Sequence, residues 1–191
     1  MLIIYAHPNK NGHCGEFLKE VEENLKEYEV NYEVLDLYAL SFDPVLLDKD
    51  LHVKDKSKIS KEILGYQEKI KNAKSLIFIY PTWWAMPPAI LKGFFDKVLI
   101  ADFAFKYVDG KPIALLNDKN GLIFSVSASS NFMQFLMCKP SVRIVQKYVL
   151  NFCGVKTKSY ILGFGDVLGD RNKLRISKMV KKGLSGLYKH I

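Results

Sequence analysis

Short apolar runs alternate with amphipathic stretches along the whole chain. Five runs have the length or the alternation of strands, at residues 2–6, 30–37, 75–80, 121–127 and 154–162. Stretches with apolar residues three and four positions apart predict helices at 16–28, 87–101, 141–152 and 175–191. Residues 41–60 form a long charged connection before a further helix. The pattern therefore predicts five strands that alternate with helices.

This alternation implies right-handed crossovers and a parallel sheet covered by helices on both faces. Five strands in 191 residues fit a flavodoxin-like doubly wound α/β fold better than a six-stranded dinucleotide-binding fold. No GxGxxG follows the first strand, and a single domain over residues 1–191 is expected. Such sheets bind ligands at the carboxyl ends of their strands, so the loops after the first, third and fourth strands are the expected site.

The first two of these loops carry distinct chemistry. The first, AHPNKNGHCGEF, leads into a helix N-terminus whose free N–H groups suit a phosphate, and His7 and His13 could add donors. An ordinary strand-to-helix turn is the alternative. The second, YPTWWAMPP, holds both tryptophans at the end of a strand, where rigid aromatics suit a flat ligand. Packing of Trp83 and Trp84 against the sheet end is the alternative.

The third loop, SVSASSNFMQFLMCKPSV, begins with small hydroxyl residues and continues with aromatic residues and methionines. Small side chains let backbone N–H groups approach the edge of a ring closely. Burial of this loop against a partner is the alternative, and the aromatic spacing does not decide between the two.

Charge and cysteine content narrow the classes of function. A net charge of +8 is compatible with phosphate-bearing ligands, although a solvated basic surface is the simpler interpretation. The same charge disfavours an acidic electron carrier, and lysines without an aromatic platform disfavour nucleic-acid binding. Cys14, Cys138 and Cys153 have no metal-ligand spacing, so reduced thiols and no metal site are expected. No apolar stretch approaches the ~18 residues of a membrane span, which predicts a cytoplasmic protein.

Several motifs in the same order resemble one known family. They are PTWWAMPPAILKGFFDKV with the following DFAFKY, then DLYALSFDP, AHP and NFCGV. Over nearly the whole chain the sequence resembles the NAD(P)H:quinone oxidoreductases of flavodoxin-like fold, including related bacterial flavin reductases. The resemblance implies a flavoenzyme in which NAD(P)H reduces a bound flavin, departs, and is replaced by a quinone or similar flat acceptor that takes the hydride. The alternative is an ancillary regulatory flavoprotein of a membrane potassium efflux system.

The resemblance also implies roles for individual residues. The cofactor-binding positions are His7, Asn11, His13, Cys14, Pro81, Thr82, Trp83, Trp84, Ala85, Ser127, Ala128, Ser129 and Arg175. Trp84 is in addition the expected catalytic residue, as the wall against which nicotinamide and quinone alternate. The other substrate-side positions are Phe105, Tyr107, Phe132 and Met133. Phe105 and Tyr107 match aromatics that reach the site from a second subunit, which implies a homodimer.

Two details of the family pattern bear on the cofactor and on the proton donor. Arg175 favours FAD over FMN, because a guanidinium pairs with a pyrophosphate or stacks on adenine, although it also fits the solvated face of the last helix. In the third loop, residues 127–130 read Ser-Ala-Ser-Ser where the family has a Thr-Thr-Gly-Gly-like run, which removes easy access to positive φ. The positions matching the family's Tyr and His fall near Phe135 and Ser141, so no proton donor is assigned.

Overall fold

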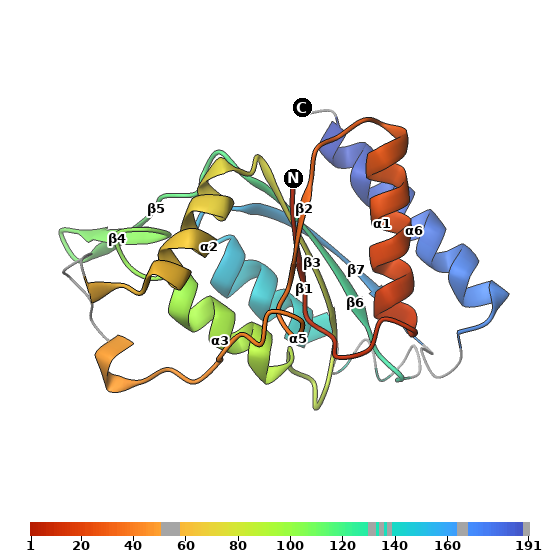
Figure 1. Ribbon diagram of the computed structural model, residues 1–191, viewed down its shortest axis with the longest axis horizontal. Helices are drawn as coiled ribbons and strands as arrows, with labels where there is room; N and C mark the ends of the chain where they lie inside the picture. The colour runs from red at the N-terminus through yellow and green to blue at the C-terminus, as the bar shows by residue number, and fades with distance from the viewer. Residues whose placement is uncertain (51–57, 130–132, 134–135, 137–138, 164–167, 189–191) are drawn as a thin grey trace.

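A five-stranded parallel sheet forms the centre of the protein (Figure 1). The computed structural model describes residues 1–50, 58–129, 133, 136, 139–163 and 168–188. The strands lie in the order β2-β1-β3-β6-β7. Their bounds are β1 (Leu2–Tyr5), β2 (Glu33–Asp36), β3 (Ser75–Pro81), β6 (Asn120–Val126) and β7 (Lys156–Leu162). The five predicted strands and the flavodoxin-like α/β class are confirmed.

Continuous apolar sequence places β1, β3 and β6 inside the sheet, because a strand covered on both faces has no solvent side. The register pairs Tyr5 with Ile79 and Pro81 with Val126, so the carboxyl ends of neighbouring strands lie close together. The chain reverses its direction of winding between β1 and β3. The loops that leave these two strands therefore flank the switch point of the sheet.

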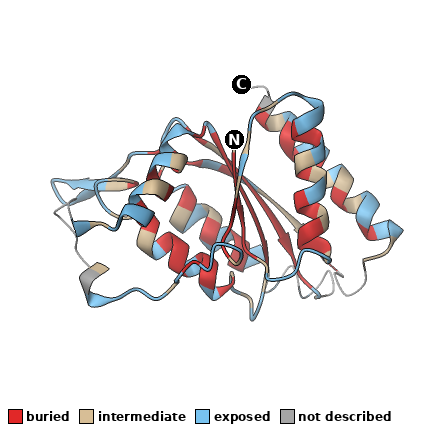
Figure 2. Cartoon of the chain, in the orientation of Figure 1, coloured by how far each residue is buried: buried red, intermediate tan, exposed pale blue. Residues whose placement is uncertain are grey.

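Helices cover both faces of the sheet and turn their buried sides toward it (Figure 2), where apolar residues form two core clusters. One face carries α1 (His13–Glu27) and α6 (Asp170–Tyr188), and the other carries α2 (Lys61–Asn72), α3 (Ala89–Val98), α5 (Lys139–Ile144) and the π-helix η4 (Val145–Leu150). A short 3-10 helix, η1 (Asp48–Asp50), lies in the charged connection. The expected start of α3 is corrected: the helix begins at Ala89, and Pro88 is the residue that caps it.

A hairpin of two further strands, β4 (Phe105–Val108) and β5 (Lys111–Ala114), is an element that the apolar pattern did not predict. Both strands are short and largely exposed, so burial imposes no alternation on their sequences. Their turn has φ of 51° at Asp109 and 73° at Gly110. Asp-Gly is a strong hairpin signal, and it is the local feature that could have revealed this element.

Side chains from the π-helix region cover the outer edge of β7. Gln146 Nε2 donates to the carbonyl oxygen of Thr157 at 2.6 Å, and the Thr157 N–H donates to Asn151 Oδ1 at 3.2 Å. The Ser159 hydroxyl donates to Gln146 Oε1 at 2.9 Å. An edge strand with free polar groups is a template for pairing with another chain. These contacts satisfy the backbone groups of Thr157 within the protein.

Candidate active site

The loops after β1 and β3 meet at the switch point. The ring centroids of His7, which follows β1, and Trp83, which follows β3, are 5.7 Å apart with the planes tilted by 55°. The end of β6 lies beside this loop, because the Thr82 N–H donates to the carbonyl oxygen of Val126 at 2.7 Å. The Thr82 and Ser125 hydroxyls lie 2.9 Å apart. Residues far apart in sequence are thus brought to the carboxyl end of one sheet.

The first loop holds its shape through its own polar groups. His7 Nδ1 accepts from the Asn9 N–H at 3.0 Å, and Asn9 Oδ1 accepts from the Asn11 N–H at 2.8 Å. Helix α1 then begins after Gly12, and no side chain caps its first N–H groups. Those groups and the positive end of the helix dipole suit an anion. Gly15 is required for this approach, since a Cβ there would lie 1.7 Å from the Lys10 carbonyl oxygen.

The histidine and cysteine at the start of α1 are turned inward. His13 is buried, and its Nε2 lies 3.4 Å from Asn172 Nδ2 in α6. The side chain of Cys14 packs in the core with Tyr5 and Phe17, and burial raises the pKa of its thiol to about 12. The thiol is therefore neutral near pH 7. The part of Cys14 suited to a phosphate is therefore its backbone N–H, in the first turn of the helix, and not its thiol.

The two tryptophans lie outside the core, because Trp84 occupies a tight two-residue turn and Trp83 directly precedes it. Trp83 and Met86 exchange backbone hydrogen bonds of 2.9 Å in both directions. Between them, Trp84 has φ of 50° and Ala85 has φ of 57°, the left-handed region that a type I′ turn demands at both central positions. The Trp84 side chain is 99% exposed. Non-glycine residues with positive φ concentrate at functional sites. The backbone of this turn and the exposed Trp84 side chain are therefore two separate indications of a site here.

We expect Ala85→Gly to raise the free energy of unfolding by about 1 kcal/mol, because glycine adopts positive φ without the clash of a Cβ. The measurement is chemical denaturation of both proteins in the absence of added ligand. Ala89→Gly in the first turn of α3 is the matched control, and it should lower stability because glycine is a poor helix former. A loss of stability in Ala85→Gly would contradict strain at this turn.

The third loop is described in part. The Ser127 N–H donates to the carbonyl oxygen of Leu162 at 2.9 Å, which joins the ends of β6 and β7. Ser127 is buried, and its hydroxyl accepts from the Ser129 N–H at 3.1 Å. Ala128 is exposed beside them, and Met133 is 39% exposed. Phe132 lies outside the described residues.

Arg175 belongs to a polar network that joins three elements at the carboxyl end of β7. Its Nη1 donates to the carbonyl oxygen of Gly163 and to Asn172 Oδ1, both at 2.8 Å. Asn172 also contacts His13 at the start of α1, so the predicted positions His13 and Arg175 are linked through one asparagine. Sequence reasoning missed Asn172. Its place three residues before Arg175 on a helix was the available signal.

The aromatics predicted to face the substrate from another subunit lie away from the strand ends. The hairpin that carries Phe105 and Tyr107 projects beside α2 and α3, at the side of the molecule opposite α1 and α6 (Figure 1). Phe105 packs on Phe152 with centroids 5.1 Å apart, and Tyr107 is 63% exposed. Neither residue is placed at the switch point of its own chain.

The site therefore combines an uncapped helix end and a rigid aromatic turn beside the strand ends, which are joined by backbone hydrogen bonds. This set suits a planar ligand that carries phosphate, and glycine at position 15 keeps the first loop close to the helix that would hold the phosphate. Within the described ranges, no group of three or more His, Cys, Asp or Glu side chains is placed to hold a metal ion. Pro81 is buried at the end of β3 and fixes the start of the aromatic loop.

Comparison with known proteins points the same way. The family described as flavodoxin-like fold matches residues 1–182. An uncharacterized NAD(P)H oxidoreductase of Haemophilus influenzae is 32% identical over 169 residues, which cover 87% of this chain and 83% of that protein. An FMN-dependent NADH:quinone oxidoreductase of Clostridium perfringens is 29% identical over 174 residues, which cover 88% of this chain and 85% of that protein. The structure of an NAD(P)H:quinone oxidoreductase from Methanothermobacter marburgensis matches with a TM-score of 0.79 and 28% identity. The match covers 95% of this chain and 94% of that one.

Proposed function

Since the chain belongs to the flavodoxin-like fold family that matches residues 1–182, we propose that it is an NAD(P)H-dependent flavin oxidoreductase that reduces quinones or similar flat acceptors. The observation that carries the proposal is the pairing, across the switch point, of an uncapped helix N-terminus with the Trp83–Met86 turn. One element suits the phosphates of a flavin. The other suits the ring and the flat molecules that stack above it.

Each residue has a defined task in this proposal. The first N–H groups of α1 bind the flavin phosphate, while His7 and Asn11 keep the loop in place through the contacts of Asn9. Residues Thr82 to Ala85 line the ring, and the backbone N–H groups of Trp84 and Ala85 meet its polar edge, because those of Thr82 and Trp83 already donate to Val126 and Met86. Ser127 to Ser129 border the ring. The bound flavin supplies the redox chemistry, by accepting a hydride from NAD(P)H and passing it to the acceptor. Trp84 orients both partners in turn, because its exposed face excludes water from one side of the pocket.

We further propose a homodimer in which the β4–β5 hairpin of one subunit approaches the site of the other. The hairpin borders a surface with exposed aromatic side chains around a cavity of about 270 Å³, lined by Phe105, Tyr148, Phe152 and residues of α3. Tyr148 is 73% exposed, an unusual state for an aromatic next to further apolar side chains. Pairing of two copies would bury this surface and would supply the substrate-side aromatics Phe105 and Tyr107.

For the flavin itself, FAD is the proposal and FMN the alternative. Arg175 supports FAD because its guanidinium lies at the end of β7, linked to the start of α1, where a pyrophosphate would extend. The Clostridium perfringens relative is named as FMN-dependent, which supports FMN. Chromatography of the flavin released from the protein separates the two.

Cytoplasmic location is a further part of the proposal. Across the described part of the chain, no helix is both long and apolar enough to cross a bilayer. The alternative of a regulatory flavoprotein of a potassium efflux system receives no support from the relatives described above.

The visible spectrum of the purified protein is the test of the proposed function. We expect a yellow protein that NADPH or NADH bleaches in the absence of oxygen and that a quinone recolours, because the same pocket serves donor and acceptor in turn. Protein that stays colourless after incubation with FAD and with FMN would overturn the proposal. Flavin that binds but is not reduced by either nicotinamide would favour the regulatory alternative.

A further inference from the structure

A second cavity lies at the opposite end of the sheet from the candidate active site. It opens between the amino ends of β6 and β7 and the last turns of α6, with a volume of about 370 Å³, within the range of sites for small ligands. The residues that line it are Asn120, Gly121, Leu122, Asn151, Lys156, Thr157, Lys158, Gly183, Gly186 and Leu187. Nothing in the proposed flavin chemistry uses this cavity.

The charge of this cavity is unbalanced. Lys156 and Lys158 are two positions apart on β7, so their side chains leave the same face of the strand, the face on which Lys158 Nζ approaches α6. No carboxylate is among the described residues that line the cavity, and neither lysine forms an ion pair within the described part of the chain. Two ammonium groups without an anion repel one another, and a bound anion would remove that repulsion.

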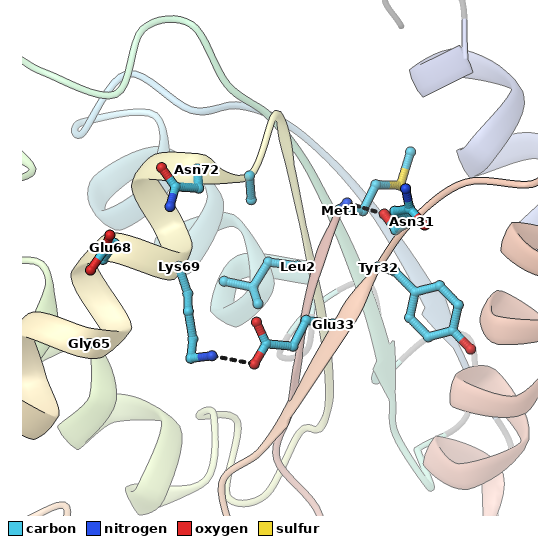
Figure 3. A pocket seen from close by; sticks show the side chains of 10 residues that line it. Met1, Leu2, Asn31, Tyr32, Glu33, Gly65, Glu68, Lys69 and Asn72 are labelled. Atoms are coloured by element: carbon cyan, nitrogen blue, oxygen red, sulfur yellow. Dashed lines mark hydrogen bonds and ion pairs between the residues drawn. The ribbon is translucent and has the colours of Figure 1, made fainter.

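The cavity at the other edge of the sheet provides a contrast. It is larger, about 550 Å³, and lies between β2 and α2 (Figure 3). Its lysine, Lys69, is paired with Glu33, and Glu68 lies on the same wall. The positive charge is already matched there by the protein itself, so that cavity offers no preference for an anion.

Two glycines of α6 shape the cavity, and one of them has no packing reason to be glycine. A Cβ at Gly183 would lie 3.0 Å from Phe124 Cζ, so glycine there permits a close approach of the helix to the sheet. A Cβ at Gly186 would meet nothing within 4 Å except Lys158 Nζ at 3.4 Å, the far end of a flexible side chain. Glycine is unfavourable inside a helix, and at position 186 its effect is to keep the cavity open beside the lysine.

The part of the chain that supplies every residue lining the cavity is rich in basic residues. Residues 119–191 hold thirteen of the 28 lysines and arginines of the chain but only two of its 20 acidic residues. A concave surface of one sign attracts small ions of the other sign. The carboxyl end of α6 carries a partial negative charge that also faces the lysines. Attraction of the lysines to this helix end is the alternative to a bound anion as the reason for their position.

We propose that this cavity binds the phosphate group of a small molecule of about mononucleotide size. Lys156 and Lys158 donate to the phosphate oxygens, and the Asn120 amide faces the rest of the ligand together with Nδ2 of Asn151, whose Oδ1 accepts from the Thr157 N–H. Charge-assisted bonds to phosphate are among the stronger polar contacts in proteins. The site is separate from the flavin pocket, so its failure would leave the proposed function intact.

The test titrates the protein, loaded with its flavin, with AMP and in parallel with inorganic phosphate, by calorimetry and by amide chemical shifts. We expect saturable binding of AMP that shifts Gly121, Thr157 and Gly186. Lys158→Ala and Lys156→Ala should each weaken it about tenfold or more, the effect of losing a charge-assisted bond. Lys178→Ala, on a part of α6 that does not line the cavity, should leave it unchanged. Gly186→Leu should abolish binding by filling the space, while the helix remains folded.

Each outcome decides the proposal. Equal affinity for inorganic phosphate and AMP would support a phosphate site that does not recognise the nucleoside. Shifts confined to residues 7–13 and 82–85 would place AMP in the flavin pocket and would overturn the proposal. The proposal also fails if neither probe binds. A lower melting temperature of Lys158→Ala would in that case indicate that the lysine only stabilises the carboxyl end of α6.

Discussion

Gly15→Ala is expected to destabilise the protein by about 3 kcal/mol and to weaken flavin binding at least about tenfold. A Cβ at position 15 would lie 1.7 Å from the Lys10 carbonyl oxygen and 2.4 Å from its carbonyl carbon. Both atoms belong to backbone, so the clash cannot be relieved by rotating a side chain, and such overpacking costs up to about 3 kcal/mol. The first loop must move away from α1, which would displace it from the N–H groups proposed to bind the flavin phosphate.

Stability and flavin affinity must be measured separately, because a ligand that binds the folded state raises its apparent stability. Chemical denaturation of flavin-free protein gives the first quantity, and fluorescence titration with flavin gives the second. Gly65→Ala is the matched control: nothing lies within 4 Å of a Cβ there, and in helix α2 alanine should raise stability by up to about 1 kcal/mol. Flavin affinity in Gly15→Ala equal to that of the unmodified protein would separate the first loop from the cofactor.

Trp84→Ala is expected to lower kcat/KM for the acceptor about tenfold or more while the flavin content remains close to normal. The indole is 99% exposed and takes part in no core packing, so its removal leaves the fold undisturbed. Stacking of a flat ring on an aromatic side chain contributes about 1–3 kcal/mol, and 1.4 kcal/mol corresponds to a factor of ten. The substitution leaves the start of α1, the proposed phosphate site, unchanged, which is why the cofactor should stay bound.

Steady-state kinetics with a quinone, normalised to bound flavin, measures this effect. Trp84→Phe is the control, because it keeps a flat aromatic face on the same strained turn and should retain most of the activity. Unchanged turnover in flavin-loaded Trp84→Ala would exclude the tryptophan as a wall of the substrate site. A parallel loss of flavin would instead mean that the turn holds the cofactor.

The elements of the main sheet were predictable because burial controls their sequences. Strand β3 reads SLIFIYP and is buried throughout, and α6 keeps an apolar residue at every turn toward the sheet. Such periodicity follows from which side of an element faces the core, so it is visible without coordinates. The loops at the carboxyl ends of β1, β3 and β6 could be singled out for the same reason, since the order of elements implies where parallel strands end.

Part of the site was also visible in sequence, by residue type and by resemblance. Trp83 and Trp84 were expected outside the core, and both are exposed. The geometry that presents them was not visible. Trp84 and Ala85 occupy a turn that glycine or asparagine usually fills, so their residue types argue against the conformation they adopt. The hairpin turn at Asp109 and Gly110 follows the usual preference and could have been found.

Local periodicity in the sequence predicts the five strands of the main sheet and their order along the chain, the helices between them and the loops at the strand ends, but not the exposed β4–β5 hairpin. Which distant residues meet depends on tertiary packing: His7 lies against Trp83, His13 is linked through Asn172 to Arg175, and Lys158 lines the same cavity as Gly186. Tertiary packing also decided that Cys14 faces the core. These contacts join residues up to 159 positions apart, and only the packing of whole helices on a sheet brings them within a few ångströms.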